Sequence, residues 1–135
     1  MPLTKISEKR LDEVRPCLKT IMHEAIARAE DKGMKVQVTE GLRTRQRQLE
    51  LFKAGKSKTM NSYHLNGKAV DVIVNDSWVF EDYKKFADIV KAVAKEYGQK
   101  ITWGGDFQTL KDGPHFQVEL SDYAYNISER ESPRV

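Results

Sequence analysis

The fold of this chain is decided by Ser62-Tyr63-His64-Leu65-Asn66-Gly67-Lys68-Ala69-Val70-Asp71, and the pattern is completed further along by Asp112-Gly113-Pro114-His115. Residues 68–74 combine β-branched and small apolar side chains, which is typical of a buried strand, and an acid such as Asp71 is out of place there as packing. Gly67 marks a turn before that strand, so His64 can fold back over the Asp71 carboxylate. His115 begins a second predicted strand, which can lie beside the first. The pattern therefore predicts that two imidazoles and one carboxylate converge.

Two imidazoles and one carboxylate are the donor set of a catalytic zinc site, because they fill three corners of a tetrahedron and leave the fourth for water. A histidine and an aspartate close together are more often a surface pair than ligands, but the whole pattern is more specific. Zinc lowers the pKa of bound water from 15.7 to about 7. A nearby carboxylate can take that proton and return it to a leaving amine, and Asp112 is the strong candidate for this role. The residues predict a metal-dependent hydrolase.

Three further residues have a functional and a structural interpretation. Arg43 is permanently cationic and can stabilise an oxyanion, or it is a solvated arginine at a strand end. Ser62 lacks a Ser-His-acid arrangement, so a loop hydrogen bond or a substrate contact is favoured over a nucleophile. Asp106 either orients a ligand from outside the coordination sphere or caps a turn. Lys53, Lys56 and Lys58 are typical of a solvated loop, yet beside the site they suit a substrate rich in carboxylates.

Periodicity on either side of these motifs predicts an α+β fold, a small and mainly antiparallel sheet packed with helices. We expect helix over 8–31, interrupted by Pro16, and a helix over 44–54 that is capped by Thr44 and turns Leu49 and Phe52 inward. A third helix is expected from Tyr83 to Tyr97. Strands are predicted over 35–39, 68–74, 101–103 and 115–119.

Length and composition bound the protein to one domain over residues 1–135, with a core at about 7–120 and a frayed tail over 121–135. The single Cys17 excludes an internal disulfide. The +3 net charge, from 23 basic and 20 acidic residues, is too balanced for a dedicated nucleic-acid binder. We find neither a secretory signal nor an apolar run of roughly 20 residues. We therefore expect cytoplasmic synthesis and no membrane insertion.

The pattern Ser-x-His-x-x-Gly-x-Ala-x-Asp followed by Asp-x-x-His resembles the zinc peptidases of the D-alanyl-D-alanine carboxypeptidase and dipeptidase superfamily. Within it, the chain resembles in particular the short phage L-alanyl-D-glutamate endopeptidases, which are endolysins. The resemblance covers roughly 7–120 and includes Gly41-Leu42-Arg43-Thr44 with Gln48 and Phe52 downstream, and Trp103-Gly104-Gly105-Asp106-Phe107. It implies a hedgehog/DD-peptidase-like fold, one Zn²⁺ held by His64, Asp71 and His115, Asp112 as catalytic acid/base, and Arg43 as a substrate or oxyanion contact. Many relatives have Glu where this chain has Asp112.

The resemblance implies a zinc-dependent peptidoglycan endopeptidase that cleaves the L-Ala–D-Glu bond of the stem peptide and lyses the bacterial wall. It further implies a monomer that acts in the periplasm or cell wall after release through a membrane pore made by a separate holin. One alternative is a D-Ala-D-Ala carboxypeptidase or dipeptidase, which needs a pocket for a free C-terminal carboxylate. Another is a non-catalytic zinc module that binds the wall, and the presence of Asp112 argues against it.

Overall fold

Two helices open the chain in the computed structural model, which describes residues 3–120. Helix α1, Lys5–Asp12, is capped by Thr4, and helix α2, Pro16–Asp31, has its proline in the first turn. Proline is well placed there because its missing N–H has no partner within the helix. The predicted interruption is thus confirmed. One apolar stripe of α2 is buried, at Leu18, Ile21, Met22, Ala25, Ile26 and Ala29.

Four antiparallel strands form a single sheet in the order β1-β2-β4-β3. Their bounds are Val36–Glu40 for β1, Ala69–Val74 for β2, Ile101–Trp103 for β3 and His115–Val118 for β4. Each predicted strand is found within one or two residues of its expected limits. Because β2 and β4 are neighbours, segments far apart in sequence, each carrying part of the motif, lie side by side.

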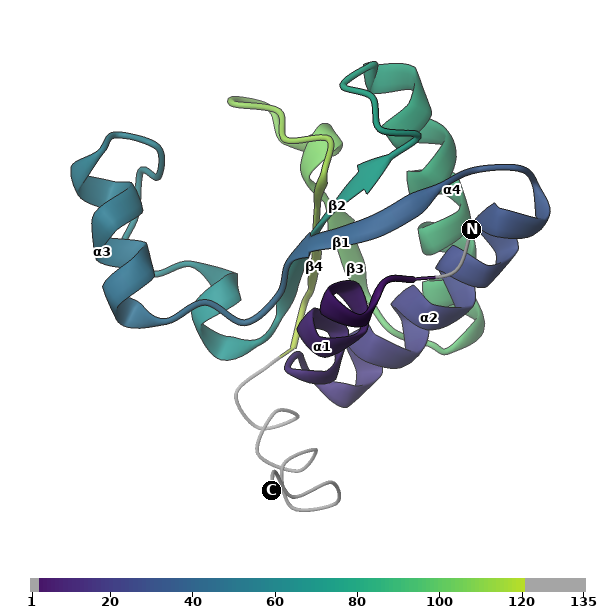
Figure 1. Ribbon diagram of the computed structural model, residues 1–135, viewed down its shortest axis with the longest axis horizontal. Helices are drawn as coiled ribbons and strands as arrows, with labels where there is room; N and C mark the ends of the chain where they lie inside the picture. The colour runs from purple at the N-terminus through teal and green to yellow at the C-terminus, as the bar shows by residue number, and fades with distance from the viewer. Residues whose placement is uncertain (1–2, 121–135) are drawn as a thin grey trace.

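The two faces of this sheet have different neighbours. Helices α1, α2 and α4, Phe80–Glu96, cover one face, whereas α3, Arg45–Lys53, stands apart on the other side of the sheet (Figure 1). Val70, Val72 and Phe116 point into the covered face, and Phe116 meets Phe86 edge to face with ring centroids 5.5 Å apart. Burying each such side chain contributes roughly 1.5–3 kcal/mol to stability. The opposite face carries the polar side chains of Asp71, His115 and Gln117.

Helix α3 departs from the prediction in which side it buries. Thr44 caps it as expected, accepting a hydrogen bond from the Arg47 backbone N–H. Phe52, however, is 44% exposed, and the residue that is fully buried is Gln48. The helix does not lie on the apolar core, so its inner face meets a polar loop instead. The prediction of an inward Phe52 was therefore wrong, as it was for Leu49, which is only half-buried.

Two short 3-10 helices, η1 at Tyr63–Asn66 and η2 at Gly104–Asp106, were not predicted, and α4 begins three residues before its expected start. Both 3-10 helices contain motif residues, His64 in η1 and Asp106 in η2. Within residues 3–120, no helix has the length and apolar character needed to cross a membrane. The predicted tail over 121–135 lies outside the described residues.

Candidate metal centre

The register of β2 against β4 sets the first two members of the site. Asp71 and His115 are directly opposite each other in the ladder, so their side chains leave the same face of the sheet. His115 Nδ1 lies 3.0 Å from Asp71 Oδ1. This pairing explains why an acid occurs within an otherwise apolar strand: its face is the one that the helices leave uncovered.

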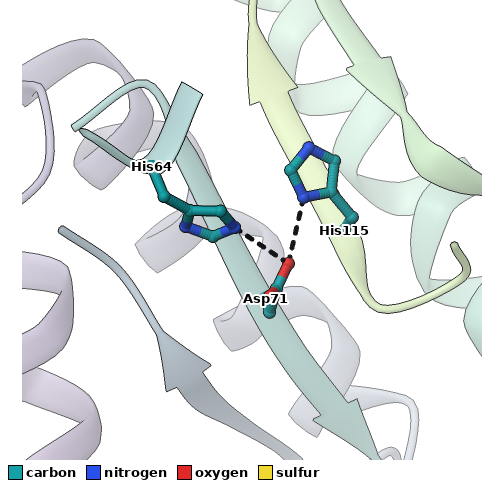
Figure 2. Close-up of side chains that lie close together, drawn as sticks. All are labelled: His64, Asp71 and His115. Atoms are coloured by element: carbon teal, nitrogen blue, oxygen red, sulfur yellow. Dashed lines mark hydrogen bonds and ion pairs between the residues drawn. The ribbon is translucent and has the colours of Figure 1, made fainter. Parts of the chain in front are cut away.

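His64 reaches the same carboxylate from η1. Gly67 ends that short helix with φ +68°, a left-handed conformation that strains a residue with a Cβ, and the chain turns directly into β2. His64 Nε2 lies 3.3 Å from Asp71 Oδ1, and the two imidazole centroids are 5.2 Å apart (Figure 2). The predicted turn over the carboxylate is confirmed. One ligand atom from each of the three residues lies within 4.8 Å of the others, so the group could hold a metal ion.

Fixed hydrogen-bond acceptors assign the tautomer of each imidazole. The Gly41 carbonyl can only accept, so His64 Nδ1, 2.8 Å away, donates to it and leaves Nε2 with a lone pair facing Asp71. Gln117 donates its amide to Glu119 at 2.8 Å, which turns its Oε1 towards His115 Nε2, also at 2.8 Å. His115 Nε2 therefore donates a hydrogen bond, and in the neutral ring Nδ1 carries the lone pair that could bind a metal. Metal-binding histidines are held in this way by acceptors behind them.

For Asp71 and His115, burial and the neighbouring polar groups shift the pKa in opposite directions. Burial by itself would raise the pKa of the Asp71 carboxyl, but the interactions of the ionised carboxylate with the His115 and His64 rings outweigh it and hold that pKa well below its ordinary value. Burial would lower the pKa of His115, but pairing with Asp71 raises it overall. Burial and the nearby Asp71 charge raise the pKa of Asp112, against the opposing charges of the two imidazoles and Arg43. A raised pKa brings this carboxyl closer to neutral pH, where proton transfer is most effective.

Asp112 is held against the ligand cluster by its backbone. Its N–H donates to the Gly104 carbonyl at 3.0 Å, and its own carbonyl accepts from the His115 N–H at 3.1 Å. A Cβ at Gly104 would collide with the Asp112 carbonyl, so a glycine is required at this close approach. A cavity of about 280 Å³ is lined by Glu40, Arg43, Leu51, Lys56, Ser57, Ser62, His64, Asp71, Asp112 and His115.

Arg43 and Ser62 are both in this cavity, and each has a structural partner. The Arg43 guanidinium grips the Glu40 carboxylate through two contacts of 2.6 and 2.7 Å and donates to Gln48 Oε1 at 2.7 Å. The Ser62 hydroxyl accepts the His64 backbone N–H at 3.2 Å. Its own O–H stays available as a donor. Ser62 thus caps a short helix and Arg43 pairs with Glu40, while both residues also line the cavity.

Asp106 is not among the residues that line the cavity. Its carboxylate lies 2.6 Å from the ammonium of Lys91 in α4, and that ammonium sits over the Trp103 ring, 5.4 Å from the ring centroid. The sequence left open whether Asp106 orients a ligand or caps a turn, and in the structure its side chain pairs with α4. Asp112 is therefore the carboxylate that shares the cavity with His64, Asp71 and His115.

Sequence reasoning missed the residues that support the site from behind. Gln117 lies two residues beyond His115 on the same face of β4, so strand alternation was a signal for it. Tyr63 donates its hydroxyl to Glu119 at 2.8 Å across 56 residues of sequence, and no local pattern predicts such a pairing. Gln48 joins Arg43 to the Thr59 carbonyl. It is a polar residue, so the periodicity of apolar residues did not indicate that it is buried.

The chain is similar in sequence to known L-alanyl-D-glutamate peptidases. The family model described as phage L-alanyl-D-glutamate peptidase matches residues 1–125. An L-alanyl-D-glutamate peptidase of Listeria phage A118 is 33% identical over 70% of this chain and 34% of its own length. The peptidoglycan L-alanyl-D-glutamate endopeptidase CwlK of Bacillus subtilis (strain 168) is 30% identical over 78% of this chain and 74% of its own length. The chain thus spans about a third of the phage relative.

Solved structures share the fold. The L-Ala D-Glu endopeptidase ChiX of Serratia marcescens aligns with a TM-score of 0.81 and 38% identity, covering 91% of this chain and 94% of that one. VanYB in complex with D-alanine-D-alanine gives 0.59 at 16% identity, covering 87% and 78%. A VanY mutant in complex with Zn(II) gives 0.58 at 16% identity, covering 86% and 78%. The expected DD-peptidase-like fold is confirmed.

Proposed function

This chain belongs to the phage L-alanyl-D-glutamate peptidase family, and from that premise we propose that it is a zinc-dependent peptidoglycan endopeptidase. Its proposed reaction is hydrolysis of the L-Ala–D-Glu bond in the stem peptide, which would lyse the bacterial wall. The observation that carries the proposal is the convergence of His64, Asp71 and His115 within ligand distance, with Asp112 in the same cavity. A non-catalytic module would have no use for that fourth group.

The donor set fits zinc. Neutral imidazole nitrogens and a carboxylate oxygen suit this borderline metal, and both lone pairs are directed to the site by the acceptors behind the rings. His64 would contribute Nε2, His115 would contribute Nδ1, and Asp71 would contribute a carboxylate oxygen. Zinc, when bound there, supplies Lewis acidity that lowers the pKa of water and polarises a carbonyl group.

The other residues handle protons and charge. Asp112 in its ionised form accepts the proton of the attacking water and then returns it to the departing amino group of D-Glu. Its backbone contacts to Gly104 and His115 fix its position relative to the ligands. The Arg43 guanidinium, held by Glu40, presents a fixed positive charge to the negative oxygen that develops on the scissile carbonyl. The Ser62 O–H has no acceptor among residues 3–120, so it can contact the substrate.

Mass spectrometry of muropeptides identifies the bond. Purified peptidoglycan is incubated with the zinc-loaded protein, and we expect stem peptides cut internally, with a new N-terminal D-Glu and intact glycan strands. Release of terminal D-Ala alone would instead support the carboxypeptidase alternative. Binding of the zinc-loaded protein to the wall without any new terminus would support the non-catalytic module. Reducing sugars in the products would indicate a glycosidase.

A further inference from the structure

Two positively charged side chains, Arg43 and Lys56, line the cavity, and they differ in their partners. Arg43 is paired with Glu40 and Gln48. The Lys56 ammonium, in contrast, makes no ion pair or hydrogen bond with any residue between 3 and 120. A charged group at the wall of a polar cavity, with no protein partner in the described chain, is available for an anionic ligand.

The backbone that carries Lys56 is held in place. Helix α3 ends at Lys53, Gly55 just beyond it has φ +73°, and the Lys56 N–H donates back to the Leu51 carbonyl at 2.9 Å. The next residue, Ser57, accepts a hydrogen bond of 2.8 Å from the buried Gln48 amide. Gln48 also holds Arg43, so the loop and the catalytic wall share one anchor. Only the lysine side chain is left to adjust to a ligand.

The charge of the chain gathers around this lysine. Residues 43–61 hold six basic side chains and one acidic side chain, so the segment carries +5 while the whole chain carries only +3. The basic members are Arg43, Arg45, Arg47, Lys53, Lys56 and Lys58. Among them Arg43 and Lys56 line the cavity, and Arg43 is already paired with Glu40. The segment attracts anions, and Lys56 is placed to bind one beside the ligand cluster.

The proposed substrate has a carboxylate at the matching place. D-Glu has two carboxyl groups, and its amino group forms the scissile bond with L-Ala. Only one carboxyl can continue the peptide, so the other is free on the residue directly after the bond. Resting on the proposed function, we propose that Lys56 binds this free carboxylate and makes the enzyme prefer stem peptides with D-Glu over those in which the same group is a carboxamide.

Paired substrates test the assignment. Two synthetic stem peptides are compared that differ only in a free carboxylate or a carboxamide on the D-Glu residue, with zinc-loaded protein. We expect the unchanged protein to cleave the acid peptide with a kcat/KM about tenfold higher than that for the carboxamide peptide, mainly through a lower KM. A tenfold preference lies between the effect of an exposed ion pair and that of a buried charge-assisted hydrogen bond. Lys56→Met should abolish this preference, and Lys56→Glu should reverse it. Reversal is a change that partial misfolding cannot produce.

Lys53→Met is the matched control, because Lys53 belongs to the same basic segment but does not line the cavity. It should keep the tenfold preference. Equal rates for both peptides with the unchanged protein, or a preference that survives in Lys56→Met, would refute carboxylate binding by Lys56 while leaving the peptidase activity in place. Cleavage of neither peptide would overturn the proposed function, and with it this inference.

Discussion

Neighbouring residues of β4 serve opposite faces of the sheet. Phe116 is fully buried under α4, whereas His115 and Gln117 point to the face that carries the ligand cluster. The covered face is apolar and gains its stability from removing surface from water. On the open face Asp71, His115 and Gln117 are linked by polar contacts, and such hydrogen bonds contribute only about 0.5–1.5 kcal/mol net apiece.

The difference teaches that stability and chemistry are separable in this fold even within one short strand. A change on the covered face should alter the free energy of unfolding but leave the geometry of the metal-binding residues, and so the activity, unchanged. A change on the open face should alter metal binding or turnover with little effect on unfolding. Four substitutions test this division, from the largest expected effect to the smallest.

Asp112→Asn should give the largest effect on turnover. The variant keeps the size of the side chain but can no longer accept and return a proton, so turnover should fall by roughly 10²–10⁴. Zinc content and the free energy of unfolding should stay unchanged, because His64, Asp71 and His115 are untouched. Stem-peptide cleavage, metal analysis and urea unfolding measure the three quantities. Asp106→Asn is the control and should stay active; an inactive, zinc-loaded Asp106→Asn beside an active Asp112→Asn would reverse the assignment.

Phe116→Ala should give the largest effect on stability. The removed ring is fully buried against Phe86, so the free energy of unfolding should fall by about 3–5 kcal/mol. Urea unfolding of the zinc-free protein measures this without a contribution from the metal. Phe52→Ala removes the same ring from the exposed side of α3 and should cost less than about 1 kcal/mol. Equal losses from the two substitutions would mean that α3 is packed as tightly as the core.

Gln117→Leu tests the support behind the metal site. The variant leaves the His115 Nε2–H without its acceptor, so the ring loses the contact that fixes its tautomer. Zinc affinity should fall by about 10–100-fold. Competition with a chelator of known affinity measures it, and nitrogen chemical shifts of the imidazole report the tautomer. The exposed Gln46→Leu is the matched control; a Gln117→Leu protein that binds zinc as tightly as this control would remove Gln117 from the site.

Tyr63→Phe should have the smallest effect, and the effect should depend on pH. Burial would raise the pKa of Glu119, but hydrogen bonds from Gln117 and Tyr63 outweigh it and the pKa is lowered. A carboxyl group with a lowered folded-state pKa stabilises the protein at pH values above its unfolded-state pKa of about 4.3. This stabilisation is lost as the pH falls through the folded-state pKa. The variant should therefore lose about 1 kcal/mol at pH 7, and the loss should shrink below about pH 4. Urea unfolding across this range measures it; a loss that is constant with pH would point to packing rather than to the carboxylate.

Much of this arrangement was predictable from local sequence. Each strand was evident from its β-branched residues, and the ligand triad from two histidines and an aspartate set around the Gly67 turn. Periodicity failed at α3, because it identifies a helix face by similarity and cannot say that the face meets a polar loop, where Gln48 is buried and Phe52 is not. The sequence also left open whether Asp106 orients a ligand or caps a turn, because its pairing with Lys91 is a contact that only the tertiary structure creates.

The zinc content of the purified protein tests the central claim, that the open face of the sheet holds a metal. The unchanged protein and His115→Ala are loaded with zinc, freed of excess metal and analysed for zinc per chain. We expect about one zinc ion per chain in the unchanged protein and almost none in His115→Ala, which has lost one of three protein ligands. An unchanged protein without zinc, or a His115→Ala protein with the full amount, would contradict the account.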